Sequence, residues 1–221
     1  MIKDLYFTPG TIEKKSTQMM ENLSRLGLIH TKKNIDFSKT ALLVLDMQNY
    51  FLKKESHAFI PSAPAIITGI KKLIDIFTNQ KLQIIYTRHI NMQETARGMG
   101  FWWKELIDKN SPMSLIIKEI NLKIGEVILK ERYDAFWNTQ LDELLNKKNI
   151  QQVIITGVMT HLCCETTARS AFMRDYQVLF AVDGTATYLE DMHVASLLNL
   201  SHGFAIPTLI SEIIADSKCQ I

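Results

Sequence analysis

The sequence predicts a three-layer α/β/α domain built on a mostly parallel sheet of six strands. From residue 40 onward, short apolar runs alternate with segments of helical periodicity. Strands that alternate with helices form a parallel sheet covered on both faces, because the crossovers are right-handed. The chain has 221 residues, of which 47% are hydrophobic and 22% charged. This length and composition are typical of one folded domain of ordinary size.

Six apolar segments are the predicted strands. Residues 41–45 are apolar throughout, which is typical of a strand that is buried on both faces. The other predicted strands cover residues 82–87, 126–130, 152–156, 177–182 and, more weakly, 203–206. Each is short enough for a strand of a compact domain.

Helices are predicted between these strands. They cover residues 61–78, 140–147, 166–174 and 191–200, and a final helix follows residue 206. Ser62 is a candidate cap of the first helix, and Pro64 is tolerated in its first turn.

Residues 1–39 are predicted to be an N-terminal extension that precedes the main domain, residues 40–221. Within the extension, residues 16–28 carry apolar side chains near helical spacing. We expect an amphipathic helix here, packed on the domain surface or on a neighbouring subunit.

Charge and cysteine content limit the partners and the compartment. The net charge of +2 gives no reason to expect nucleic acid or an anionic membrane as a partner. The three cysteines are Cys163, Cys164 and Cys219; adjacent cysteines rarely bridge, and an odd count leaves one thiol over. We therefore expect a reducing, cytoplasmic location and no disulfide framework. We also expect no signal peptide, and no apolar stretch approaches the roughly 20 residues that cross a bilayer.

Three predicted strand ends carry reactive side chains. Asp46 follows the first strand, Lys130 ends the third, and Cys163 follows the fourth near the start of a predicted helix. Ligands of parallel sheets bind beyond the carboxyl ends of the strands. A helix N-terminus and a lysine both favour a thiolate, and a carboxylate can carry its proton. This set is suited to nucleophilic acyl transfer by the Cys163 thiol.

The same segments resemble a known family. Residues 43–51 (LVLDMQNYF), 130–136 (KERYDAF) and 157–163 (GVMTHLC) look like the three signature segments of the isochorismatase-like cysteine hydrolase superfamily. The resemblance runs from about residue 40 to the C-terminus and agrees with the three-layer fold. It implies a small-molecule substrate and a homo-oligomer, either a dimer or a tetramer.

The resemblance also implies roles for single residues. Asp46 would be the general base, Lys130 the second polar partner and Cys163 the nucleophile. The bond between Val158 and Met159 would be a cis peptide, and the N–H groups of Met159 and Cys163 would form an oxyanion hole.

The sequence departs from the family pattern in two places. His161 stands where many relatives have an acid or an amide, and it either contacts substrate or caps a helix turn. Only His89 follows the second strand, without the Asp-x-His pair of metal-dependent nicotinamidases. We therefore expect no metal and no cofactor, and this argues against nicotinamidase activity. Cys164 points away from the nucleophile on a helix and is expected in the core.

Further candidates for substrate binding lie near predicted loops. The aromatic candidates are Phe51, Trp102, Trp103, Tyr133 and Phe136. Trp102 and Trp103 belong to a long irregular stretch, residues 89–114, which is typical of a functional cover. Arg88 is a candidate for binding a substrate carboxylate. The alternatives are core or interface packing for the aromatic residues and a solvated surface charge for Arg88.

Three functions are compatible with these observations. The first is hydrolysis of an amide or ureido C–N bond through a thioester at Cys163. The second is vinyl-ether hydrolysis of isochorismate by Asp46 without the thiol. The third is a non-catalytic binding subunit, against which the complete set of Asp46, Lys130 and Cys163 argues.

Overall fold

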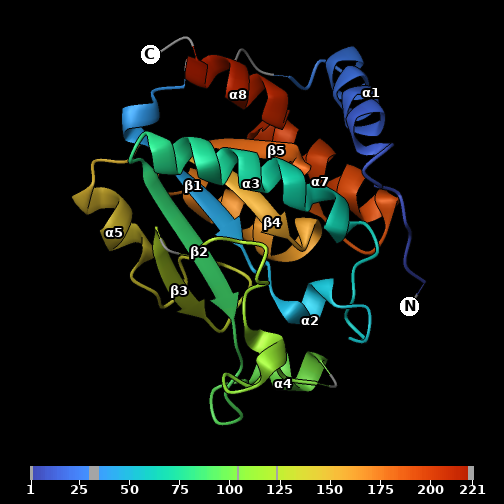
Figure 1. Ribbon diagram of the computed structural model, residues 1–221, viewed down its shortest axis with the longest axis vertical. Coiled ribbons are helices and arrows are strands. Elements are labelled where there is room, and N and C mark those ends of the chain that lie inside the picture. Colours follow the sequence, from blue (N-terminus) through green and yellow to red (C-terminus); the bar gives the residue numbers. More distant parts are fainter. Residues whose placement is uncertain (1, 30–34, 104, 123, 219–221) are drawn as a thin grey trace.

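A six-stranded sheet lies at the centre of the computed structural model, which describes residues 2–29, 35–103, 105–122 and 124–218. The strand order is β3-β2-β1-β4-β5-β6, and every neighbouring pair is parallel. Helices cover the sheet, so the predicted three-layer α/β/α fold is confirmed (Figure 1). Cys219 lies outside the described residues.

The strands are close to their predicted positions. They are β1 (Thr40–Leu45), β2 (Gln83–His89), β3 (Glu126–Lys130), β4 (Gln152–Val158), β5 (Gln177–Ala186) and β6 (Ile206–Thr208). The predicted start of the last strand at residue 203 is wrong, because Gly203 is the final residue of the preceding helix.

The described helices lie on both faces of this sheet and beyond the carboxyl ends of its strands. They are α1 (Ile12–Arg25), α2 (Asn49–Leu52), α3 (Ala63–Asn79), α4 (Gly98–Trp102), α5 (Leu141–Lys147), α6 (Glu165–Phe172), α7 (Glu190–Gly203) and α8 (Ile210–Lys218). Helix α3 contacts α8 on one face, and right-handed crossovers place α6 and α7 on the other. None of the described helices combines the length and apolar character needed to span a bilayer.

The carboxyl ends of the strands open onto a region of short helices and turns. Helices α2 and α4 lie beyond the ends of β1 and β2 (Figure 1). The stretch predicted to be irregular, residues 89–114, contains α4 and the 3₁₀ turn η2 (Pro112–Ser114). These segments stand over the edge of the sheet at which we expect the reactive residues.

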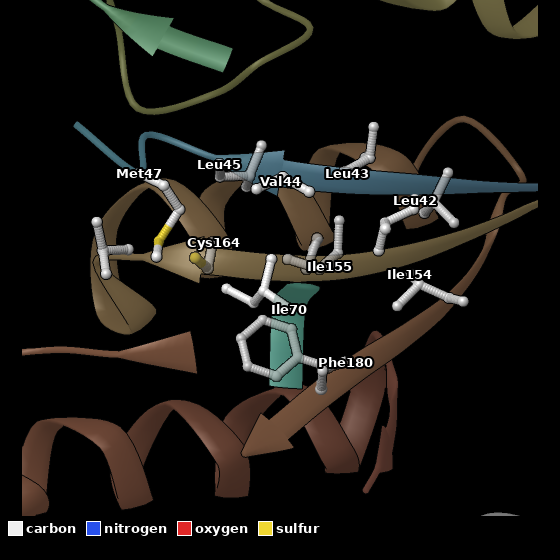
Figure 2. Close-up of a cluster of buried hydrophobic side chains, with 14 of the residues drawn as sticks. Leu42, Leu43, Val44, Leu45, Met47, Ile70, Ile154, Ile155, Cys164 and Phe180 are labelled. Atoms are coloured by element: carbon white, nitrogen blue, oxygen red, sulfur yellow. The ribbon is translucent and has the colours of Figure 1, made fainter. Parts of the chain in front are cut away.

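The core holds the two central strands side by side. Strands β1 and β4 are buried along their whole length. Figure 2 shows side chains of both strands packed with Ile70 of α3 and Phe180 of β5. Burying each such aliphatic or aromatic side chain stabilises the fold by roughly 1.5–3 kcal/mol. Cys164 is fully buried in this cluster, so its predicted place in the core is confirmed.

The N-terminal segment is fastened to the main domain. Helix α1 buries Met19 and Leu23 against the domain and contacts β5 and α7. The predicted role of Ser62 as a helix cap is wrong, because its hydroxyl makes no capping hydrogen bond. That hydroxyl instead accepts from the N–H groups of Tyr6 and Phe7, at 2.9 and 3.1 Å. Ser62 therefore stands at the N-cap position of α3, but its side chain anchors the segment before α1 and does not cap the helix.

Gly157 lets β4 approach β1 where the two strands end. Its φ is +110°, and a Cβ atom there would lie 2.0 Å from the backbone oxygen of Leu45. Only glycine fits this combination of backbone angle and close approach. The pairing of β4 with β5 also shifts register between Ile155 and Gly157. The chain thus leaves β4 along a path set by this glycine.

Candidate active site

Four neighbouring strands bring titratable side chains to one edge of the sheet. Asp46 directly follows β1, His89 ends β2 and Lys130 ends β3. Cys163 lies in a π-helical turn after β4, η3 (Thr160–Cys164). Since β3, β2, β1 and β4 are adjacent in the sheet, their carboxyl ends meet at one place.

The three residues predicted to act together are in contact. The Nζ atom of Lys130 lies 2.7 Å from Oδ2 of Asp46 and 3.2 Å from Sγ of Cys163. The exposed fraction is 0% for Asp46, 1% for Lys130 and 5% for Cys163. The structure therefore places a carboxylate, an ammonium and a thiol within one small buried cluster.

The Lys130 ammonium has four acceptors for its three protons. Besides Asp46 and Cys163, Nζ lies 3.0 Å from the carbonyl oxygen of Arg132 and 3.3 Å from Nδ1 of His89. An ammonium only donates, so Nδ1 of His89 is the acceptor. Burial, and then the charge of Lys130, lower the pKa of His89 to about 4. His89 is thus a neutral member of the cluster.

Asp46 is held by a threonine as well as by the lysine. The hydroxyl of Thr87 donates to Oδ1 of Asp46 at 2.6 Å and accepts from its N–H at 3.1 Å. Burial is the largest single influence and acts to raise the pKa of Asp46. The charges of Lys130 and His89 and the hydrogen bonds from Cys163 and Lys130 together outweigh it, and the pKa lies below its usual range. The carboxylate is therefore ionised at neutral pH and can accept a proton.

Asp46 also has an uncommon backbone conformation. Its φ is +51°, which few residues other than glycine adopt. Aspartate is one of the residues that tolerates this region, and such conformations cluster at functional sites.

Cys163 is a protonated thiol at rest. Burial raises its pKa to about 12, the charge of Asp46 adds to the rise, and Lys130 opposes it. The thiol makes a side-chain hydrogen bond with Asp46. The carboxylate is thus placed to take the thiol proton when the sulfur attacks, because donor and acceptor are already in contact.

The turn that carries Cys163 follows a cis peptide bond between Val158 and Met159, the bond that the family resemblance singles out. The carbonyl oxygen of Met159 accepts from the N–H groups of Leu162 and Cys164, at 3.1 and 3.2 Å. These bonds close the turn beneath the sulfur.

A cavity of about 410 Å³ opens above the thiol. Its lining is largely aromatic and apolar, and four predicted substrate-binding residues belong to it: Phe51, Trp102, Trp103 and Tyr133. Nε1 of Trp103 donates to the hydroxyl of Tyr133 at 2.7 Å. The other lining residues are Lys3, Tyr50, His57, Ala58, His89, Asn91, Met99, Glu105, Ile107, Met159, Leu162, Cys163 and Tyr188.

A family model, the Isochorismatase domain, matches residues 40–212, which is more than half of the chain. The chain belongs to the isochorismatase family. It is a hydrolase of this family, and the region around its reactive cluster lies within the matched residues.

Relatives agree with this assignment. The chain is 40% identical to Nicotinamidase 3 of Arabidopsis thaliana over 181 residues, which cover 79% of this chain and 87% of that protein. It is 30% identical to Ureidoacrylate amidohydrolase RutB of Yersinia enterocolitica, over 67% of this chain and 75% of that protein. A crystal structure of a cysteine hydrolase from Pseudomonas syringae pv. phaseolicola 1448A has the same fold. Its TM-score is 0.80 at 24% identity, covering 86% of this chain and 97% of that one.

Three other candidates of this isochorismatase-family hydrolase lie outside the cavity lining. Arg88 donates through Nε to the carbonyl oxygen of Ser114 at 2.8 Å, so its guanidinium binds the backbone of the turn η2. Phe136 is buried and stacks on Tyr176. Nδ1 of His161 lies 2.6 Å from the hydroxyl oxygen of Thr187. The structure thus does not bring these three to the cavity.

Sequence reasoning missed several residues of the site. Thr87 was part of the second predicted strand, and His89 was considered only as a metal ligand. Lys3 lies in the extension, where no motif marks it. Alternation along the strand could have found Thr87 and His89, because residues two apart point to the same face.

The donor atoms of Asp46, His89 and Cys163 lie within 4.8 Å of one another. Among the residues that the structure describes, this group could hold a metal ion. The Lys130 ammonium already contacts each of the three, so a metal ion would have to displace it. That the site takes no metal and no cofactor stays a prediction.

Proposed function

We propose that this hydrolase cleaves an amide or ureido C–N bond of a small molecule through a thioester at Cys163. Asp46 is the general base and Lys130 holds the charge of the cluster. The contact of one buried ammonium with both the Asp46 carboxylate and the Cys163 sulfur supports this proposal most directly.

The reaction has two steps. Asp46 takes the thiol proton, the sulfur attacks the carbonyl carbon, and the C–N bond breaks as Asp46 passes the proton to the leaving nitrogen. Asp46 then takes a proton from water, which attacks the thioester and releases the acid. The S–C bond breaks, and Asp46 returns the proton taken from water to the sulfur, which restores the thiol. Lys130 stays charged throughout and stabilises both the carboxylate and the thiolate.

The developing oxyanion needs donors fixed in the protein. We assign this role to the N–H groups of Met159, which directly precedes η3, and of Cys163, which lies within it. Donors that are held in place before the reaction stabilise such charge by about 2.7–4 kcal/mol each.

The substrate class follows from the cavity and from the relatives. Aromatic walls at Phe51, Trp103 and Tyr133 favour a flat acyl group of low polarity. The names of the two relatives, a nicotinamidase and an amidohydrolase, support amide or ureido bonds. Vinyl-ether hydrolysis by Asp46 is the alternative, and the placement of the thiol against Asp46 and Lys130 favours the thioester route.

Released ammonia, measured across nicotinamide, other carboxamides and ureido compounds, with isochorismate assayed beside them, tests the function. Cys163→Ala should lower turnover of the accepted amide by roughly 10³-fold or more. Cys164→Ala is the matched control and should retain turnover. Isochorismate cleavage that survives in Cys163→Ala, with no amide cleaved by the unaltered protein, would establish the alternative.

We further propose that the hydrolase is cytoplasmic and homo-oligomeric, and that residues 1–39 form an extension of the domain. The exposed fractions of Phe101 and Trp102, 89% and 71%, support an oligomer, because neighbouring exposed aromatic residues mark interaction surfaces. Sedimentation velocity tests the oligomeric state, and a monomer at micromolar concentration would contradict it.

A further inference from the structure

A second polar cluster lines the cavity, apart from the cluster around Cys163. The hydroxyl oxygen of Tyr50 lies 3.2 Å from Nε2 of His57, and Nδ1 of His57 lies 2.8 Å from a carboxylate oxygen of Glu105. All three residues belong to the cavity lining. The side chains of His57 and Glu105 are 62% and 57% exposed, whereas Cys163 is buried. This second cluster therefore stands at the cavity mouth and Cys163 at its base.

The N-terminal segment holds this cluster in place. The ammonium of Lys3 donates to the carbonyl oxygens of His57 and Phe59, at 2.5 and 2.8 Å. It also lies 4.3 Å from the centre of the Tyr188 ring, another wall of the cavity. The rings of Tyr50 and His57 meet edge to face at 5.4 Å. These contacts fix the His57 backbone and the direction of its ring.

Glu105, the last member of the hydrogen-bonded series Tyr50–His57–Glu105, fixes the direction of its hydrogen bonds. The carboxylate of Glu105 only accepts, so Nδ1 of His57 carries the proton. In a neutral imidazole Nε2 then carries no proton, and its lone pair accepts a hydrogen bond from the Tyr50 hydroxyl. The one hydroxyl proton of Tyr50 is thereby used, and its oxygen can offer only acceptor lone pairs to a molecule in the cavity.

We propose that Tyr50, oriented by His57 and Glu105, is an acceptor subsite for an O–H or N–H group on the substrate's far end. The subsite selects flat carboxamides that carry a hydroxyl or amino group remote from the scissile bond. This inference rests on the proposed function for the placement of the scissile bond at Cys163.

Binding to a Cys163→Ala background tests the subsite without turnover. The probes are benzamide, 3-hydroxybenzamide, 4-hydroxybenzamide and 4-methoxybenzamide, and their binding is measured by calorimetry at pH 8.5. One hydroxylated isomer should bind about 3- to 10-fold more tightly than benzamide, as one hydrogen bond supplies. The methoxy compound, which cannot donate, should show no gain.

Variants assign the preference to Tyr50. Adding Tyr50→Phe should abolish the advantage of the hydroxylated probe. Tyr176→Phe is the matched control, since the Tyr176 hydroxyl bonds Asp142 away from the cavity lining, and it should retain the advantage. A preference that persists in Tyr50→Phe overturns the proposal. So does the absence of any preference, or of any binding, in the Cys163→Ala background.

The outcomes for the two proposals are separate. If the unaltered protein releases no ammonia from any amide while the preference follows Tyr50, the proposed reaction fails and the subsite stands. If amides are cleaved through Cys163 but the hydroxylated probes gain nothing, the subsite fails and the reaction stands.

Discussion

Lys130 is the residue on which the arrangement of the active site depends. Its ammonium and the Asp46 carboxylate are both fully shielded from solvent and lie 2.7 Å apart. Each ion loses its hydration when it is buried, and only the attraction of an oppositely charged partner offsets this loss. The same ammonium faces the sulfur of Cys163, so stability and chemistry depend on one side chain.

Lys130→Met should therefore damage both properties. Removing one member of a buried ion pair destabilises a protein by about 3–5 kcal/mol, and we expect this loss in urea unfolding. Turnover should fall at least about 100-fold, since the proton transfer to Asp46 loses its charge balance. The double variant Asp46→Asn with Lys130→Met should recover much of the stability but none of the turnover. An unfolding free energy unchanged in the single variant would contradict the ion pair.

The sequence predicted Asp46 and Lys130 because each stands at the end of an apolar run, and Cys163 because it follows the fourth predicted strand near the start of a helix. It could not predict the partners that depend on strand register. His89 meets Lys130 because those two residues are paired across β2 and β3. Arg88 was a candidate for substrate binding, yet successive strand residues point to opposite faces. Arg88 thus faces away from its neighbours Thr87 and His89 and bonds Ser114.

At the scale of elements, the exit from β4 positions the nucleophile. Gly157 pairs with Leu45, the residue before Asp46, so the ends of β1 and β4 are fixed relative to each other. The turn η3 then starts from this point and carries Cys163. A change in this short segment displaces the sulfur from the carboxylate.

Gly157→Ala should destabilise the protein by more than about 2 kcal/mol and reduce turnover. The reason is that the added Cβ meets the Leu45 oxygen at 2.0 Å, in a backbone conformation that alanine avoids. Gly203→Ala is the matched control, because its added Cβ would have nothing within 4 Å, and it should change stability by no more than about 1 kcal/mol. Thermal unfolding of both variants tests this prediction, and equal melting temperatures for the two variants would refute the steric argument.

Element boundaries that the sequence missed have long-range causes. Ser62 stands at a position that local rules assign to a helix cap. Its hydroxyl is taken by Tyr6, which is 56 residues away in the chain, and no local pattern encodes that contact. The cavity wall likewise includes Lys3, because the N-terminal segment folds back onto the domain. Motifs within residues 40–212 could not show this.

For the whole molecule, the alternation of strands and helices was sufficient to predict the layers. Right-handed crossovers left few topologies, and the observed order places β1 beside β4 at the centre. The cavity was harder to predict, because its walls come from segments distant in sequence: Lys3, Tyr50, Trp103, Tyr133 and Tyr188. The spacing of apolar residues along the sequence predicts which face of a helix or strand is buried. It does not predict which side chains from distant segments meet around a cavity.

Buried neutral histidines should make the stability of the whole fold depend on pH. Burial lowers the pKa of His193 to about 3, and burial together with the charge of Lys130 lowers that of His89 to about 4. The unfolded chain binds protons on these residues below about pH 6.5, and the folded chain does not until far lower pH. Stability should therefore fall as the pH falls from 6.5 toward 4. The contribution of Asp46, whose folded pKa is lowered, is lost only below about pH 3.9, outside this window.

Urea unfolding at pH 7.5, 6.5 and 5.5 measures this dependence. Two such histidines should lower the unfolding free energy by about 2–3 kcal/mol between pH 7.5 and 5.5. His193→Gln should remove roughly half of that decrease, because it removes one of the two histidines, His193 and His89, whose pKa burial lowers to about 3 and about 4. His202 is exposed, so His202→Gln is the matched control and should leave the decrease unchanged. A decrease of full size in His193→Gln would show that protons enter elsewhere in the fold, and that burial of His193 does not set its acid sensitivity.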